Sequence, residues 1–342
     1  IRDKLVTGVQ TCALPIFASG DPGLTASPIP SASPAPSPTP FPPSDTLRLT
    51  VVENITGGLT PKSVVATQTG LFFAQNVGYL HTMSIFNRRF RRVKTLSDTV
   101  ALGKFIPGAP NVKVRGAPVE GAASVDGRFM YVSQYSMEGP GFRNPGFDTC
   151  TPSDRIDDSY VYKIDTEKLK VVDLIRVGRV PKNLATSPDG RWLLVANWCS
   201  WDVTVVDLRK WKVVASIPVG ADPRGIAFSP DSRRAWIGVV ADDTLSVIDL
   251  KKLAVVKEYP TMDAPRHLVM GKNGRYLYVV IEGAESEKKV DGYVLKVDTR
   301  DGSVVDKVGG MIEPRTMVAA PDGRSLYVAD LDRKSTRLNS SH

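Results

Sequence analysis

Basic residues recur at one kind of position along the chain, and their chemistry is that of an anion-binding site. Each directly follows a proline that opens an apolar segment: Lys62, Lys182, Arg224, Arg266 and Arg315. Glu120 takes the matching place in a further segment, two residues after its proline. Lysine and arginine bind phosphate and carboxylate groups, and the planar fork of arginine suits both. The five cations form an anion site if folding gathers them, and are only a solvated rim otherwise.

An internal repeat carries these residues. Residues 179–220 align with residues 221–262, and the prolines of three successive copies are 42 residues apart. The copies begin at Pro61, Pro118, Pro181, Pro223, Pro265 and Pro314. Each complete copy contains four short runs rich in Val, Ile, Leu, Tyr and Trp, with turns such as PDG between them. Four strands in a repeat of this length are typical of a β-propeller blade, which buries its faces only against its neighbours.

The motifs PRGIAFSPDS, LLVANW, DVTVVDL and IPVG resemble the YVTN repeat of YncE-like β-propellers, across about residues 57–331. This resemblance implies an all-β propeller of four-stranded blades, expected here over residues 45–331. Five blades and the first half of a sixth are present, whereas such propellers usually have seven. Residues 47–52 resemble the strand that completes the final blade. We expect the intact protein to be a monomer.

Propeller geometry brings three features to one face, here named the top face. It holds the loops before the first strand and between the second and third strands of every blade. The five cations, here named the basic ring, each begin an innermost strand, and Glu120 interrupts the ring. The insertion, residues 136–156, and the loop NWCSWD at 197–202 lie on the same face. Trp198 and Trp201 are expected to be exposed there and to stack on a ligand, or else to cover the insertion.

Two cysteines of the top face predict a disulfide. Cys150 lies in the insertion and Cys199 in the corresponding loop of the next blade. An even number of cysteines remains once Cys12 is excluded with the N-terminal segment, which suits an exported protein. The pairing requires Cα atoms within about 7 Å of each other. The alternative is two free thiols that share a face.

Signatures of catalysis are sparse. The sequence has no HExxH, P-loop, GxSxG or CxxCH motif. His81 and His267 are isolated, and the aspartates of the insertion match no EF-hand spacing. We therefore predict no catalytic residue, no metal site and no cofactor. Only Glu120 and His267 are expected near the rim, fewer acid and base groups than a metal- or cofactor-dependent propeller enzyme needs.

Both ends of the chain differ in composition from the repeat. Residues 1–16 and 332–342 resemble translated sequencing adapters and are set aside as artefacts, which lowers the formal net charge from +8 to +5. Residues 17–44 are rich in Pro, Ser and Ala and are expected to form a disordered linker. This linker resembles the stalks of bacterial lipoproteins and secreted proteins. We therefore expect an extracytoplasmic location, with the signal sequence lost by truncation, and no transmembrane span in this fragment.

These features favour a non-catalytic, secreted or surface-anchored binding propeller. Its ligand is expected to be anionic: a small acid, a glycan or single-stranded nucleic acid. The family resemblance points the same way, because many YncE-like proteins look like non-enzymatic binders and single-stranded DNA binding is implied for some. Two alternatives stay open. One is a propeller enzyme of lactonase or quinoprotein type, and the other is a structural scaffold in a surface protein complex.

Overall fold

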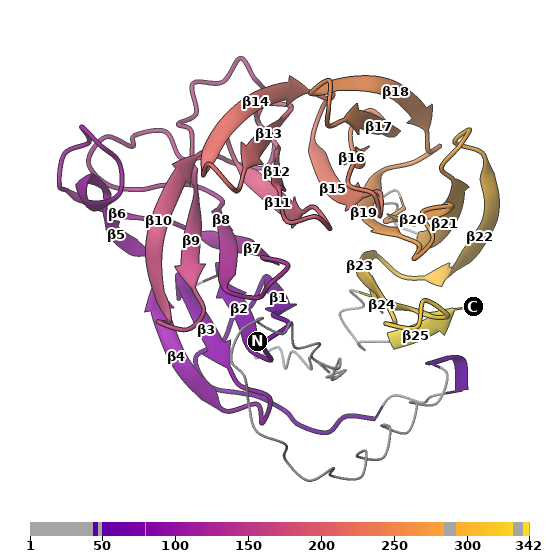
Figure 1. Ribbon diagram of the computed structural model, residues 1–342, viewed down its shortest axis with the longest axis horizontal. Coiled ribbons are helices and arrows are strands. Elements are labelled where there is room, and N and C mark those ends of the chain that lie inside the picture. The colour runs from indigo at the N-terminus through magenta and orange to yellow at the C-terminus, as the bar shows by residue number, and fades with distance from the viewer. Residues whose placement is uncertain (1–43, 47–49, 79, 284–291, 331–337, 342) are drawn as a thin grey trace, which may run out of the picture.

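The chain folds into a ring of β-sheets, and its computed structural model describes residues 44–46, 50–78, 80–283, 292–330 and 338–341. Five sheets have four antiparallel strands and a sixth has three. Figure 1 shows the sheets around a common axis, with the first strand of each innermost and the last strand of each complete blade at the rim. The predicted all-β propeller, with five blades and part of a sixth, is confirmed. Among the described residues, no helix is long and apolar enough to cross a membrane.

The strands follow the repeat in chain order. Blade 1 contains β1 (Ser63–Ala66), β2 (Phe72–Asn76), β3 (Thr82–Phe86) and β4 (Arg92–Ser97). Blade 2 contains β7 (Pro118–Ala123), β8 (Phe129–Gln134), β9 (Tyr160–Asp165) and β10 (Lys170–Arg176). Blade 3 contains β11 (Pro181–Thr186), β12 (Trp192–Asn197), β13 (Asp202–Asp207) and β14 (Lys212–Pro218).

Blade 4 contains β15 (Pro223–Phe228), β16 (Arg234–Val239), β17 (Thr244–Asp249) and β18 (Ala254–Pro260). Blade 5 contains β19 (Pro265–Met270), β20 (Tyr276–Ile281), β21 (Gly292–Asp298) and β22 (Val304–Met311). Blade 6 contains β23 (Pro314–Ala319), β24 (Leu326–Asp330) and β25 (Leu338–Ser341). A separate hairpin, β5 (Thr99–Ala101) and β6 (Lys113–Arg115), stands between blades 1 and 2, and its loop begins with the short helix η2 (Leu102–Lys104). Another short helix, η1 (Ser44–Thr46), precedes blade 1.

The core lies between successive blades. All six residues of β12 are buried, because blade 2 covers one face of that strand and blade 4 the other. Outer strands such as β14 instead alternate between exposed and half-buried residues along most of their length. Burial of a Leu or Val side chain contributes about 1.5–3 kcal/mol. Each blade is therefore stabilised mainly by the two neighbours against which it packs.

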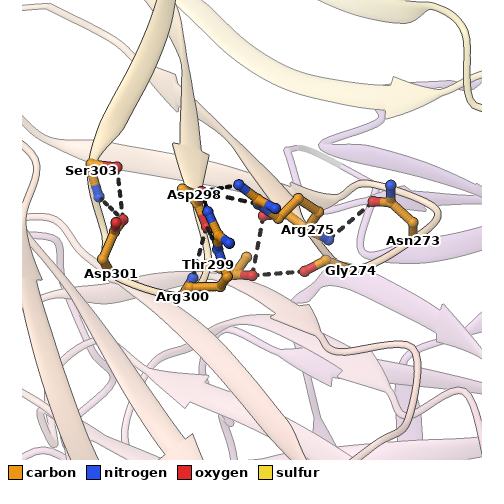
Figure 2. A network of polar contacts seen from close by, with 8 residues as sticks. All are labelled: Asn273, Gly274, Arg275, Asp298, Thr299, Arg300, Asp301 and Ser303. Carbon is orange, nitrogen blue, oxygen red and sulfur yellow. Dashed lines mark hydrogen bonds and ion pairs between the residues drawn. The ribbon is translucent and has the colours of Figure 1, made fainter.

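A network of ion pairs and hydrogen bonds joins two turns of blade 5 on the face opposite to the top face (Figure 2). The carboxylate of Asp298 accepts hydrogen bonds from Arg275 Nε at 3.0 Å and Arg300 Nη2 at 2.9 Å. Its Oδ1 also accepts the backbone N–H of Arg300. The hydrogen bonds from Arg300 and then from Arg275 hold the pKa of Asp298 below its ordinary value. This aspartate thus joins the turn after β19 to the turn after β21.

The same aspartate ends the third strand of other blades. Asp165, Asp207 and Asp249 each accept the backbone N–H of the residue two positions later, at 2.9–3.0 Å. The recurring aspartate of the repeat is therefore a turn-forming residue, which is a common use of Asp side chains. In the other recurring turn, Gly190 has φ +66° and Ser232 has φ +58°, so the PDG and PDS triplets form equivalent tight turns.

The first part of the ring departs from one expectation, and the last part includes residues that the sequence analysis set aside. Of residues 47–52, the described part, 50–52, forms no strand, and Val51 and Val52 are exposed. Residues 338–341 were set aside as artefact, yet they form β25, which pairs antiparallel with β24. The reason is that a strand edge offers backbone donors and acceptors to any chain that reaches it, whatever its side chains. Residues 1–43, with most of the expected linker, lie outside the described residues.

Asp298→Asn is expected to lower the stability of the fold. The amide cannot pair ionically with Arg275 and Arg300, and it places an NH₂ group where the carboxylate accepts hydrogen bonds. The carboxylate has a lowered pKa, so its contribution is present above the ordinary pKa of an aspartate and disappears as pH falls below it. Urea unfolding at neutral and acidic pH measures both effects. Asp301→Asn is the control, because Asp301 bonds only within its own turn, to Ser303.

Candidate functional site

Each cation of the basic ring stands at the start of an innermost strand, and all of them except Lys62 lie next to an irregularity of the backbone. Register shifts follow the opening proline in five blades, between Pro118 and Glu120, Pro181 and Asn183, Pro223 and Ile226, Pro265 and His267, and Pro314 and Thr316. Such β-bulges redirect side chains and are frequent beside functional sites. The sequence analysis did not predict them. Their only sequence signal is the proline itself, which cannot donate a ladder hydrogen bond.

The residue before the proline is also unusual. Val180, Asp222 and Glu313 have φ of +51°, +58° and +51°, in the left-handed region that non-glycine residues rarely adopt. The surrounding fold must hold these residues in place, because each conformation costs of order 1–3 kcal/mol. A left-handed residue followed by proline and a bulge therefore sets the entry of the innermost strand in blades 3, 4 and 6.

The basic ring is assembled in the structure. Burial lowers the pKa of Lys62, and Arg224, Arg315 and Arg266 lower it further by repulsion. Burial likewise lowers the pKa of Lys182 to about 8, with Asp148 opposing and the charges of Arg224 and Lys62 adding to the shift. Residues from five blades therefore act on one another electrostatically, although they are spread over more than 250 positions of sequence.

Three carboxylates that the sequence analysis did not assign to the ring already partner some of its cations. Lys182 Nζ lies 2.5 Å from Asp148 Oδ1. Glu282 pairs with both Arg266 and Arg315, and Glu313 is 3.4 Å from Arg315. The sequence analysis placed one carboxylate, Glu120, in the ring, and the structure adds these three. Glu282 directly follows β20, and Asp148 belongs to the insertion, so only the fold shows that they reach the ring.

Lys62 and Arg224 differ from the other three cations. Among the described residues, neither side chain forms an ion pair or a side-chain hydrogen bond. Glu120 interacts with both through its charge, but burial is the stronger effect and raises the pKa of its carboxyl to about 7. At neutral pH Glu120 therefore only partly neutralises these two cations. The sequence analysis expected Glu120 among the cations of the ring, and in the structure its charge interacts with Lys62 and Arg224.

The tryptophans do not form the expected stacking surface. Trp198 is only 6% exposed, and its indole N–H donates to the backbone carbonyl of Asp148 at 2.8 Å. The ammonium of Lys182 lies 3.8 Å from the centre of its ring and covers that face. Trp201 is half-buried in a turn with φ +57°. The expectation of exposed tryptophans was wrong for Trp198, because the insertion folds over it, as the alternative interpretation had it.

A disulfide joins Cys150 to Cys199, with Cα atoms 5.3 Å apart, inside the limit of about 7 Å. Both residues are buried, in a small apolar cluster with Ile156, Val180 and Trp198. The bond fastens the insertion of blade 2 to the loop of blade 3 that follows β12. Asp148 lies two residues before Cys150 and Trp198 one residue before Cys199, so the disulfide holds the environment of Lys182 together.

The hairpin β5–β6 supports the insertion from blade 1. Arg115 and Glu138 exchange two backbone hydrogen bonds of 2.8 Å, and their side chains form an ion pair. Met137 of the insertion and Leu102 and Val114 of the hairpin share one buried cluster with blades 1 and 2. The hairpin was not predicted, although surplus residues between the copies at Pro61 and Pro118 were its signal.

Three other features were considered as sites: His267, groups of metal-binding side chains, and a cavity on the opposite face. His267 is near Arg224, and burial followed by that charge lowers its pKa to about 4, while its Nδ1 lies 3.4 Å from the backbone N–H of Met317. Within the described ranges, no three His, Cys, Asp or Glu side chains are grouped to hold a metal ion. A cavity of about 400 Å³ lies on the opposite face between blades 1 and 2, lined by Thr69, Leu71, Arg128, Asp165, Thr166, Glu167 and Lys168, none of which belongs to the basic ring.

The similarity of this chain to known proteins is found in comparisons of structure. No protein-family model and no curated protein matches it. Among solved structures it is similar to hydrazine synthase of Kuenenia stuttgartiensis, with a TM-score of 0.52 and 25% identity over 66% of this chain and 59% of that chain. It thus spans less than two thirds of that protein's length. It is also similar to a functionally unknown protein from Desulfotomaculum acetoxidans DSM 771, with a TM-score of 0.62, 12% identity and 84% of each chain covered.

Replacing both Cys150 and Cys199 by alanine is expected to destabilise the protein by about 2–4 kcal/mol, since the bond closes a loop across 49 residues. The insertion should then become accessible to proteases near Asp148. Denaturant unfolding of oxidised protein, dithiol-reduced protein and the double variant measures the change. Equal stability of all three would contradict a structural role for this bond.

Proposed function

We propose that this protein is a non-catalytic binding propeller that accepts an anion at the basic ring. The observation that carries the proposal is that Lys62 and Arg224, in the midst of other cations, have no carboxylate paired with them among the described residues. Cations held in a partly desolvated site repel one another, and an anion that enters relieves that repulsion. An arginine fork can bind a carboxylate or phosphate in a bidentate manner.

The surrounding carboxylates favour a small ligand. Asp148, Glu282 and Glu313 alternate with the cations, so a long polyanion would meet negative charge on several sides. Glu282 is engaged by Arg266 and Arg315, so we expect a small acid to bind at Lys62 and Arg224 without contacting it. A short glycan or a single-stranded nucleic acid stays within the proposal only if one of its anionic groups reaches the same two cations. The buried Trp198 offers such a ligand no stacking surface.

The biological setting is part of the same proposal. A disulfide buried between two loops suits an oxidising compartment, which supports a periplasmic, secreted or cell-surface location. The YVTN-type repeat supports membership of the YncE-like propellers, whose members look like binders. The intact protein would be a monomer, and a structural scaffold would bind a surface protein partner at the same top face.

A propeller enzyme is the second candidate, and one observation favours it. The pKa of Glu120 is raised to about 7 by burial and that of Lys182 is lowered to about 8 by burial, so both groups exchange protons near neutral pH. One structural neighbour is named as an enzyme, hydrazine synthase. Turnover of a lactone that is abolished by Glu120→Gln would replace the binding proposal with this one.

Lys62→Ala and Arg224→Ala are each expected to weaken anion binding about tenfold or more, because each removes one charge that has no internal partner. The measurement is calorimetric titration with a small carboxylic acid, an acidic oligosaccharide and short single-stranded DNA at rising salt. Binding should weaken as salt increases. Lys94→Ala is the matched control, since Lys94 is on the outer strand β4 of the same blade as Lys62. Binding that is unchanged in both ring variants contradicts the proposal.

The affinity is also expected to fall as pH rises through about 7. A bound anion disfavours the ionised form of Glu120, so binding takes up a proton where that carboxyl has begun to ionise. Above about 8, the loss of charge on Lys182 weakens binding further. Glu120→Gln should bind tightly and without pH dependence between pH 6 and 7.5 (a range of roughly one unit around the raised pKa), and should still weaken above about 8, where Lys182 loses its charge. A wild-type affinity that is constant over this range excludes the role given to Glu120.

A further inference from the structure

Asp148 is the one carboxylate of the site that faces open solvent while it lies against a buried cation. Its side chain is 71% exposed, whereas that of its partner Lys182 is 11% exposed. Two hydrogen bonds reach the carboxylate, and both go to Oδ1, from Lys182 Nζ at 2.5 Å and from the Tyr135 hydroxyl at 2.9 Å. Among the described residues, no hydrogen bond reaches Oδ2. One oxygen of Asp148 is therefore free to accept a hydrogen bond from a ligand.

The position of this carboxylate is well determined. Two donors from different elements hold Oδ1, and Trp198 binds the backbone carbonyl of the same residue. The disulfide two residues later fixes the chain that carries it. Partial burial, the largest single effect, opposes ionisation, but the hydrogen bond and charge of Lys182 and the hydrogen bond from Tyr135 together outweigh it and hold the pKa of Asp148 below its ordinary value. The group is consequently a fixed negative charge at the ring.

The charge of Asp148 reaches the unpaired cations. It interacts electrostatically with Lys62, Arg224 and Arg266 as well as with Lys182. An external anion bound at Lys62 and Arg224 must therefore lie within the field of Asp148. That neighbourhood favours a ligand that presents a donor to Oδ2 and disfavours one that presents a second anionic group.

We propose that Asp148 sets the ligand class of the basic ring, which takes an acid whose other end carries a hydrogen-bond donor, such as a hydroxyl or an ammonium group. The acid group binds between Lys62 and Arg224, and the donor binds the free oxygen of Asp148. This inference rests on the proposed anion binding at the ring. A hydroxy acid, an amino acid and a uronic sugar share this chemistry, whereas a simple fatty acid and a dicarboxylate lack it.

The test uses four acids with the same three-carbon chain after the carboxylate: butyrate, γ-hydroxybutyrate, γ-aminobutyrate and glutarate. They differ in the group at the far end of that chain, which is hydrogen, hydroxyl, ammonium or a second carboxylate. The complete chain with its disulfide intact should bind the hydroxy and amino acids about fivefold or more tightly than butyrate, because each adds one hydrogen bond to an ionised acceptor. Glutarate should bind no more tightly than butyrate. Calorimetric titration or ligand-detected NMR gives the four dissociation constants.

Asp148→Asn should abolish the advantage of γ-aminobutyrate over butyrate and make glutarate the tightest ligand of the four. Asp306→Asn is the matched control, because it removes the same charge from the exposed outer strand β22 and should keep the wild-type order. The wild-type series needs no variant, so the proposal stays testable if the Asp148 variant fails to fold.

The outcomes separate the two proposals. If all four acids bind the wild type equally and binding depends on Arg224, the ring is an anion site and the role of Asp148 is overturned. That role is also overturned if Asp148→Asn still binds γ-aminobutyrate more tightly than butyrate. If no acid binds either the wild type or Asp148→Asn, while acidic oligosaccharide and single-stranded DNA also fail to bind, the proposed function itself is overturned.

Discussion

Burial between neighbouring blades is the constraint on which the rest of this structure depends. A strand such as β12, buried along its whole length, has no stable environment in an isolated blade. The same packing fixes the angle between successive sheets and so decides where the start of each innermost strand points. The innermost strands in turn carry the basic ring. A functional site drawn from five blades is possible because every blade is held by its neighbours.

The ring itself is a balance between charges that are paired and charges that are not. Glu282 and Glu313 together balance the charges of Arg266 and Arg315 on one side, and Asp148 balances that of Lys182 on the other. Between these pairs, Lys62 and Arg224 face Glu120, whose carboxyl has a pKa of about 7 and is therefore only partly ionised. Ion pairs on both sides confine the unpaired positive charge to one part of the ring. In the proposed function, this local balance, more than the total number of basic residues, accounts for the preference of the site for an anion.

Two insertions modify the regular repeat beside the basic ring: the hairpin β5–β6 and residues 136–156. The hairpin β5–β6 supports the insertion from blade 1, and the Cys150–Cys199 disulfide fastens it to blade 3. Together they bring Asp148 to Lys182 and close the insertion over Trp198. Irregular segments on a rigid repeat scaffold are a common location of binding function. Here the segment that breaks the repeat also supplies Asp148, the charge that we propose limits which anions bind.

Much of the architecture could be predicted from the sequence, because its causes are local and periodic. The 42-residue spacing, the apolar runs and the PDG turns predict four-stranded blades, and the recurrence of Lys or Arg after proline predicts the ring. The loop positions of Cys150 and Cys199 were sufficient to predict their pairing. The bulges, the left-handed Val180 and Asp222, the burial of Trp198 and the carboxylates of Asp148 and Glu282 were decided only by the tertiary structure. The burial of Trp198 and the positions of Asp148 and Glu282 depend on contacts between different blades, and such contacts leave no periodic trace in a single sequence. The bulges do recur with the repeat, but the proline that precedes them does not by itself reveal a change of register.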